Sequence, residues 1–432
     1  MRLPDLGAPF WRLWTASTIS AVGDGLTFVA LPLLAARLTR DPAQVALVQA
    51  AEHSSWLLLG LVSGALADRW DRLRIMAVTD LVRSVLFGAF AVAVVGGYVT
   101  LPLLGAFAFV VGLFGVMNLN AASAFLPAVV RRERLETANS WLQVGMTVPS
   151  TMIGPPLGGV LFVAAVSLPF TVDAVSFLVS GLIVLSLRSR VQRAPRTEAP
   201  PPLGAALAEG IRFLWGSIVL RTLCLLLAVF NGVSAAVMGI LVLFATETLG
   251  LSETGYGVLL VVFAVGGLAG MVSVSRVRAM LGTSGVVVLV LAVQAAAMLA
   301  TGLAPSVPML AAGSLLAGAT SGMWNVATIS LRQRIVPDAL LGRVTSAYRL
   351  VAFAAMPVGA TLGGLLARAY GLAAPFTVAG VLLAGCTAAA LRWLPASAIA
   401  AAEAAAPAHD PEPEPGTTEP VAAHPDPATP DG

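Results

Sequence analysis

The sequence has no lysine and little charge of either sign. All 25 basic residues are arginine, and charged residues make up only 11% of the 432 positions. A P-loop uses a lysine amine to hold the β- and γ-phosphates of a nucleotide, and Schiff-base chemistry requires the same group. Both kinds of site are therefore excluded, and we expect neither a nucleotide nor a nucleic acid as a partner.

Cysteine and histidine are also scarce. Cys224 and Cys386 lie in separate apolar stretches, and His53, His409 and His424 are scattered along the chain. A zinc site needs several such ligands close together, and a disulfide framework needs several paired cysteines. We therefore expect no disulfide framework, no metal and no cofactor.

Long apolar runs dominate the sequence, which is 58% hydrophobic with a mean hydropathy of +0.89. A helix of about 20 apolar residues crosses a hydrocarbon core of about 30 Å. The first run begins near Phe10 and many others follow, so it is a span and not a cleaved signal peptide. The runs predict an all-α integral membrane protein with twelve transmembrane helices, at residues 11–37, 44–66, 76–97, 101–124, 138–164, 168–187, 219–246, 254–274, 284–303, 308–331, 342–367 and 372–393.

Arginine is distributed unevenly between alternate loops. Clusters occur at 69–74, 131–134, 188–196, 276–278 and 332–334, and the intervening loops are almost free of arginine. Because arginine-rich loops stay in the cytoplasm, this distribution places both termini there. Only Arg37, Arg40 and Arg368 lie near outer loops.

The longest internal polar break divides the spans into six and six. We predict an N-terminal six-helix half at 1–187, a cytoplasmic linker at 188–216, a C-terminal six-helix half at 217–395 and a disordered, acidic, Pro- and Ala-rich cytoplasmic tail at 396–432. ALAEGIRFLW in the linker is compatible with a short helix on the membrane surface. The tail lacks the large apolar residues that a core needs.

The two halves carry copies of one motif. GPPLGG, from Gly154 to Gly159, recurs as GATLGG, from Gly359 to Gly364, and both copies follow an arginine cluster. Parallel copies are expected when two halves are related by an axis normal to the membrane. We therefore expect two pseudo-symmetric six-helix bundles around a central cavity.

The loop between the second and third predicted spans reads GALADRWDRLR. This stretch resembles the loop signature of the major facilitator superfamily, G-x-L-A-D-R-x-x-R. The matching positions are Gly64, Leu66, Asp68, Arg69 and Arg72, and the chain departs from the family where Asp71 replaces a common glycine.

Further motifs resemble the macrolide- and siderophore-efflux branch of that superfamily, the drug:proton antiporters of type 3. They are FWRLWTASTISAVGDGLTFVALPLL, ADRWDR, DLVR and the antiporter-like GPPLGG with Gly154, Pro155, Gly158 and Gly159. The fourth span lacks an arginine that many proton-coupled drug exporters carry. The resemblance implies a monomeric multidrug-efflux antiporter, multi-pass in the bacterial cytoplasmic membrane and surrounded by lipid. It would export a hydrophobic or amphipathic small molecule, such as a drug, macrolide or siderophore, in exchange for protons.

Asp68 and Arg69 have two interpretations. They either anchor the second span at the cytoplasmic face, or form a gating contact that breaks and reforms during transport. For the second role the expected partner is the start of the predicted span 342–367, near Gly342 and Arg343, where free N–H groups and the helix dipole favour a carboxylate.

Two carboxylates lie deep in predicted spans. Asp24 is about 15 Å along the helix from the interfacial Trp14, which places it near mid-bilayer. An ionisable group there is a functional candidate, as a proton site or a polar anchor for substrate, although a hydrogen bond to a neighbouring helix is the structural alternative. Glu52 either takes up and releases protons or faces an outer vestibule.

The remaining polar groups and glycines suggest structural roles. Asp80 and Arg83, spaced i and i+3, are expected to form an internal ion pair rather than a substrate site. The glycines and prolines of GMTVPSTMIGPPLGG are expected to allow close helix approach and bending. Other polar residues in the spans line the cavity or join helices.

Three alternatives to efflux stay open. The same fold could catalyse uptake or lipid flipping. A polytopic membrane enzyme is disfavoured, because such enzymes carry dense Asp or His motifs at a span end and this sequence has none. We therefore predict a transporter and not an enzyme.

Overall fold

The computed structural model describes residues 5–69, 71–131, 134–187 and 203–404, and all regular structure within these ranges is helical. The N-terminal half consists of α1 (Ala8–Leu38), α2 (Pro42–Arg69), α3 (Arg72–Val95), α4 (Leu101–Phe125), η1 (Leu126–Ala128), α5 (Leu135–Val148), η3 (Pro149–Ile153), α6 (Gly154–Ala164) and α7 (Leu168–Ser186). The C-terminal half consists of α8 (Leu203–Gly216), α9 (Ile218–Leu243), η4 (Phe244–Thr248), α10 (Glu253–Leu303), α11 (Val307–Ile335), α12 (Asp338–Tyr370), α13 (Ala374–Trp393) and α14 (Ala396–Ala404).

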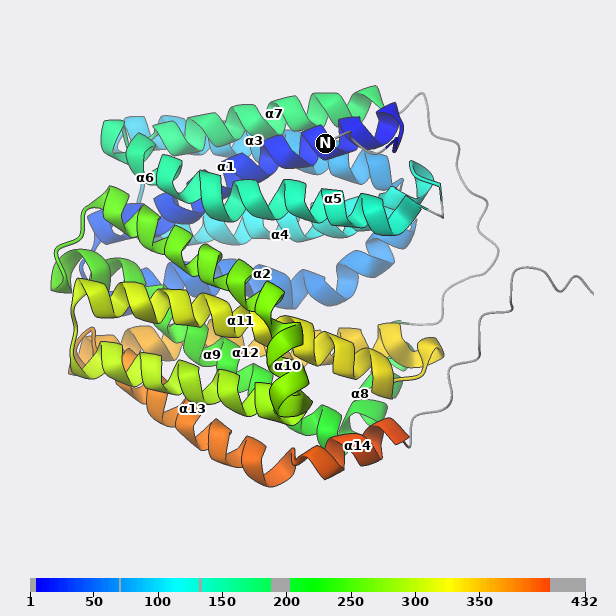
Figure 1. The fold of residues 1–432 in the computed structure, drawn as a ribbon. Helices are drawn as coiled ribbons and strands as arrows, with labels where there is room; N and C mark the ends of the chain where they lie inside the picture. The colour runs from blue at the N-terminus through cyan, green and yellow to red at the C-terminus, as the bar shows by residue number, and fades with distance from the viewer. Residues whose placement is uncertain (1–4, 70, 132–133, 188–202, 405–432) are drawn as a thin grey trace, which may run out of the picture.

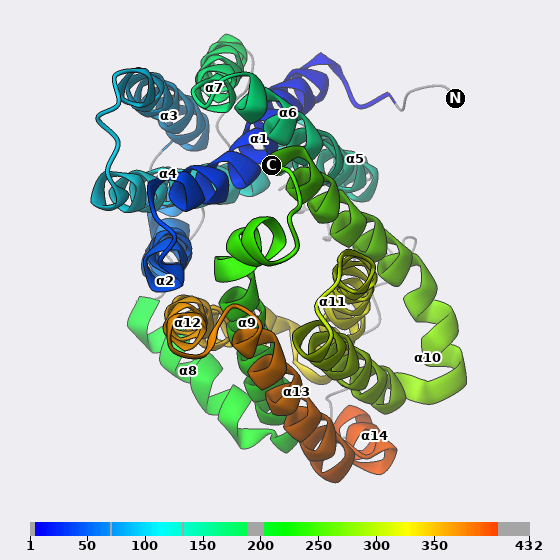
Figure 2. The same ribbon diagram turned by 90° about the vertical axis from the view of Figure 1, so that its left-hand side faces the viewer.

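The long helices run side by side as two bundles, α1–α7 above and α9–α13 below in Figure 1. Figure 2 views the same bundles along the helices. We call the end where α1 ends and α2 begins the distal end (left in Figure 1), and the opposite end, which holds the starts of α1 and α5, the proximal end. This arrangement confirms the predicted all-helical membrane fold.

Nine helices in the described ranges are long and apolar enough to cross a membrane. One of them, α10, contains two predicted spans as two helical segments that meet at Gly282, where the backbone leaves the helical conformation with φ 69°, a value that favours glycine. Two further helices, α2 and α11, are 28 and 29 residues long. Each of the twelve predicted spans therefore coincides with a helical segment.

Polar side chains fix where several helices begin. Asp71 accepts hydrogen bonds from the backbone N–H groups of Leu73 and Arg74 at 3.1 and 3.2 Å, and so caps α3. Ser252 caps α10 in the same way, through the N–H of Gly255 at 3.0 Å. Such caps satisfy donors that have no partner inside the helix.

Two segments flank the C-terminal bundle, the linker before it and the tail after it. The helix predicted in the linker is confirmed, and the prediction for the tail needs a correction. The linker helix occurs as α8 and packs on α12 through Gly210. The tail was predicted to be unstructured from residue 396, but its first residues form α14, where Ile399 is buried and Glu403 pairs with Arg334 at 3.0 Å. Alanine has the highest helix propensity, so an Ala-rich segment with one buried anchor becomes helical. Residues 405–432 lie outside the described ranges.

Candidate functional site

A cavity of about 560 Å³ lies between the two halves. Helices α1 to α6 of the N-terminal half line one side, and α9, α10 and α11 of the C-terminal half line the other. Its volume falls within the range of small-molecule sites. The cavity therefore occupies the place where the repeated halves were expected to enclose one.

The N-terminal wall carries an ion pair. Arg83 Nη2 donates to Asp24 Oδ1 at 2.5 Å, and the guanidinium carbon lies 3.8 Å from the ring centroid of Phe177. Arg83 is buried, with 8% of its side chain exposed, whereas Asp24 is 44% exposed to the cavity. Asp24 therefore faces the interior, as expected of an ionisable group in a span, but it is paired rather than isolated.

Glu52 of α2 also lines the cavity. Its carboxylate accepts a long hydrogen bond of 3.5 Å from Gln49, whose amide also lies 3.4 Å from His53. Glu52 forms no ion pair with any residue that the structure describes. The structure thus places Glu52 in the central cavity together with Asp24.

The prediction that Asp80 pairs with Arg83 is wrong for the described side chains. Asp80 instead accepts hydrogen bonds from Asn118 Nδ2 at 2.7 Å and Ser180 Oγ at 2.6 Å. The neutral donors come from α4 and α7, which leaves Arg83 free to reach α1. Spacing within one helix could not reveal these partners, because they lie on other helices.

Asp173 of α7 was missed by the sequence reasoning. Its side chain is fully buried and accepts hydrogen bonds from Thr27 Oγ1 at 2.6 Å and Ser176 Oγ at 3.0 Å. Gly23 of α1 packs directly against this carboxylate, since a Cβ there would lie 2.0 Å from Asp173 Oδ1. An acidic residue inside the apolar run FTVDAVSF carries the same signal that identified Asp24.

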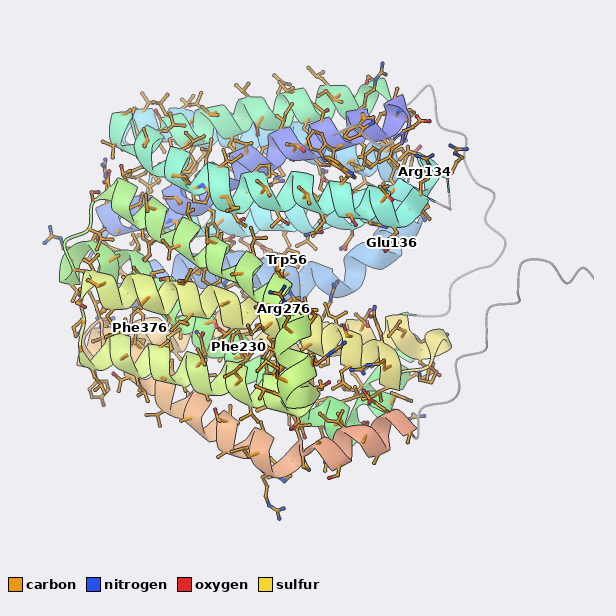
Figure 3. The ribbon with its side chains drawn as sticks, viewed as in Figure 1. Trp56, Arg134, Glu136, Phe230, Arg276 and Phe376 are labelled. Carbon is orange, nitrogen blue, oxygen red and sulfur yellow. The ribbon has the colours of Figure 1, made fainter. Side chains whose placement is uncertain are left out.

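The C-terminal wall of the cavity is largely uncharged. The residues it contributes are Met238, Leu260, Phe263, Ala264, Gly267, Leu268, Met271, Gly318, Ser321, Gly322 and Asn325. At the boundary between the halves, Trp56 of α2, labelled in Figure 3, contacts a residue of the other half. Its ring meets Phe353 of α12 edge to face, with 6.1 Å between ring centroids. The cavity therefore has a charged wall and an apolar wall.

Three ion pairs join the halves at the distal end. Their partners are Arg37 with Glu253 at 2.6 Å, Arg40 with Glu247 at 3.6 Å and Arg368 with Asp41 at 3.5 Å. These are the three arginines that did not follow the cytoplasmic distribution. Each now has an acidic partner in the opposite half.

Glycines bring helices into close contact around the cavity. A Cβ on Gly154 would lie 2.5 Å from the Cα of Gly25 in α1, and one on Gly158 would lie 2.6 Å from the carbonyl oxygen of Leu26. Pro155 contacts Gly257 of α10 in the opposite half. The span-five glycines thus allow the close approach of helices that was expected of them, and the motif also contacts α10 of the other half, which was not predicted.

The loop signature is described only in part. Helix α2 extends to Arg69, but the side chains of Gly64, Leu66, Asp68 and Arg69 lie outside the described residues, and Arg72 begins α3. At the expected partner site, Arg343 is paired with Glu209 of α8. The gating contact of Asp68 therefore stays a prediction.

Comparison with known proteins identifies related transporters. A family model described as "Transmembrane secretion effector" matches residues 6–422. The multidrug efflux pump Tap of Mycolicibacterium fortuitum is 27% identical over 379 residues, covering 85% of this chain and 91% of that protein. The enterobactin exporter EntS of Salmonella typhi is 26% identical over 371 residues, covering 82% and 85%.

Solved structures share the fold at low sequence identity. A bacterial homologue of ferroportin in an inward-facing state has a TM-score of 0.69 and 19% identity, covering 89% of this chain and 98% of that one. An inward-facing bacterial homologue of the lysosomal transporter Spinster has a TM-score of 0.64 and 18% identity, covering 92% and 93%. These similarities concern the fold alone.

Proposed function

The chain belongs to the transmembrane secretion effectors, a family of major facilitator transporters, and on that premise we propose that it is a proton-coupled exporter of a hydrophobic or amphipathic small molecule. It is a membrane transporter and not an enzyme. The observation that carries the proposal is the cavity between the halves, which has carboxylates on one wall and apolar side chains on the other.

Proton coupling is assigned to Asp24 and Glu52. Protonation of Asp24 would weaken its ion pair with Arg83, and Glu52 is a second carboxylate within the same cavity. A carboxylate that binds either a proton or a polar part of the substrate couples proton movement to substrate movement, because binding of one affects binding of the other. Export rather than uptake follows the names of the relatives, which are efflux pumps and exporters.

The rest of the organisation follows from this function. We place the proximal end, both termini and the linker in the cytoplasm, with the protein as a monomer in a bacterial cytoplasmic membrane. The halves 1–187 and 217–395 would rock about the cavity, and the Asp68 contact would form when the proximal end closes. The close contacts at the distal end then correspond to the inward-facing conformation.

Transport in proteoliposomes tests the proposal, with rhodamine 6G as the probe. We expect a pH gradient to drive rhodamine accumulation by the wild type, and Asp24→Asn and Glu52→Gln to abolish that accumulation while keeping exchange without a gradient. Glu136→Gln is the matched control, because Glu136 is an exposed acid at the proximal end of α5 (Figure 3). Full gradient-driven transport by both cavity variants would refute proton coupling, and counterflow in both orientations distinguishes export from uptake.

A further inference from the structure

A second cavity of about 100 Å³ lies within the C-terminal half, between α9, α10, α11 and α13. It shares four lining residues with the central cavity: Met238, Leu260, Phe263 and Ser321. The smaller cavity, which we call the side pocket, therefore adjoins the larger one. A ligand in the central cavity contacts residues that also line the side pocket.

The walls of the side pocket are uncharged and mostly apolar. Beyond the four shared residues, the lining comprises Ser234, Val237, Leu241, Leu259, Gln294, Ala297, Met298, Thr301, Leu310, Gly313, Ser314, Ala317 and Phe376. Gln294 is buried, and its side-chain oxygen accepts a hydrogen bond of 2.7 Å from Thr320. The described walls thus suit a neutral apolar group rather than an ion.

The N-terminal half has an aromatic cluster around the residue that matches Phe376. Pro-Phe-Thr-Val at 169–172 recurs at 375–378, so Phe170 of α7 matches Phe376 of α13. Phe170 packs on Phe90 with 5.0 Å between ring centroids, and Phe90 stacks on Phe107 at 4.0 Å. Phe87 and Phe177 extend this aromatic cluster across α3, α4 and α7.

In the C-terminal half, Phe376 packs on Phe244 with 4.5 Å between ring centroids, and small side chains line the side pocket beside it. Helices α10 and α11 contribute Ala297, Gly313, Ser314 and Ala317. An unfilled apolar space forfeits the dispersion contacts that stabilise a packed interior. Because the side pocket adjoins the central cavity, a ligand group that reaches it from that cavity would restore these contacts.

We propose that the side pocket is a specificity subsite that receives a neutral apolar group of the transported molecule. A dry cavity of about 150 Å³ binds benzene, so this smaller one suits a short or branched alkyl group of about four carbons. The polar part of the same molecule then stays in the central cavity, towards Asp24 and Glu52. The subsite rests on the proposed transport function, because it assigns a site to part of that substrate.

A series of rhodamine 6G analogues that differ only in the ester alkyl group, from methyl to hexyl, tests the proposal. Binding to the protein in lipid nanodiscs is measured by fluorescence polarisation, with protein-free nanodiscs as the baseline for partitioning. For the wild type we expect affinity to rise about fourfold per added CH₂ while the pocket fills, and then to level off. Ala317→Leu occupies the pocket and should remove this dependence on chain length while still binding the methyl ester.

The matched control is Ala312→Leu, which places the same side chain on an exposed face of α11 and should behave as the wild type. Ser314→Val provides a second way to narrow the pocket if Ala317→Leu does not fold. An unchanged chain-length dependence in a folded pocket variant would overturn the subsite and leave the transport proposal intact. If no ester bound the wild type saturably, the proposed function and the dependent subsite would both fail.

Discussion

Reversing the charge of Arg37 should open the distal end of the transporter. Arg37 ends α1 in one half, and both its Nε and Nη2 donate to the Glu253 carboxylate at the start of α10 in the other, at 2.9 and 2.6 Å. Its guanidinium also lies 4.6 Å from the ring centroid of Phe162. Phe162 belongs to α6 of the same half, so a conformation in which the halves separate at this end must break the Arg37–Glu253 pair but can keep the Phe162 contact. Arg37→Glu therefore favours that conformation through the loss of the pair.

The size of the effect follows from the exposure of the pair. The side chains are 45% and 25% exposed, so solvent screens them and the ion pair is worth only about 0.2–1 kcal/mol. The contact with Phe162 lies within one half, so it is present in both conformations and cancels from their ratio. Repulsion between two exposed carboxylates is of similar size to the lost pair, which brings the effect of Arg37→Glu to about 1 kcal/mol. Since 1.4 kcal/mol is a factor of ten, the closed-to-open ratio at the distal end should fall about fivefold.

Labelling of a single cysteine measures this ratio without any substrate. Thr151→Cys places a thiol in the central cavity, and the two native cysteines, both buried, are replaced by alanine. A membrane-impermeant maleimide is added from the side that the distal end faces. The labelling rate should rise about fivefold in Arg37→Glu and return towards the wild-type rate in Arg37→Glu/Glu253→Arg.

The reciprocal exchange separates pairing from general disruption. Glu253→Arg alone should increase the rate as well, because it brings two cations together. A rate that does not change in Arg37→Glu would show that the pair does not hold the distal end closed. A double variant as open as the single ones would attribute the effect to local packing instead of charge.

Other substitutions test packing and capping. Gly154→Ala should lower the melting temperature through a loss of about 1–3 kcal/mol in unfolding free energy, because its Cβ would meet the α1 backbone. Gly88→Ala is the control: a Cβ there enters open space, so the change should be neutral or stabilising. Equal effects of the two substitutions would contradict the packing role of Gly154. Asp68→Asn should stop transport if Asp68 forms the gating contact. Asp71→Gly should preserve transport, because replacing the Asp71 N-cap of α3 by glycine costs only a few tenths of a kcal/mol. The reverse result would exclude the gating contact. Arg83→Gln should lower the free energy of unfolding by about 2–3 kcal/mol, because it removes the ion-pair partner of Asp24. A variant with the thermal stability of the wild type would contradict this role of Arg83.

The fold was accessible from the sequence because membrane spans are local features. A run of about 20 apolar residues has to be helical in a bilayer, whatever its neighbours are. The segment α10 follows this rule, since the spans predicted at 254–274 and 284–303 are two helical segments that meet at the non-helical Gly282. The helix α14 was missed because the absence of a large apolar core does not exclude a short Ala-rich helix docked by Ile399.

The candidate site was accessible only in part, because it depends on contacts between helices. The depth of Asp24 in its span indicated an interior position, but its partner Arg83 is 59 residues away and could not be assigned. The same limit produced the incorrect Asp80–Arg83 pair, in which a plausible neighbour on one helix was preferred to Asn118 on another. The three arginines that do not follow the cytoplasmic distribution could have indicated contacts between the halves, since all three form ion pairs with the opposite half.

The duplicated glycine motif explains why the charges gather where they do. In the first copy, a Cβ on Gly159 would lie 3.0 Å from the carbonyl oxygen of Glu253 in the opposite half. In the second, one on Gly364 would lie 2.9 Å from the carbonyl oxygen of Pro42, the residue after Asp41. Each copy therefore packs its last glycine against the opposite half, at or next to an acidic residue that pairs with an arginine of the glycine's own half. Close backbone contact brings the two halves together beside these charges, so the repeated motif and the solvent-exposed ion pairs stabilise the same closed distal end.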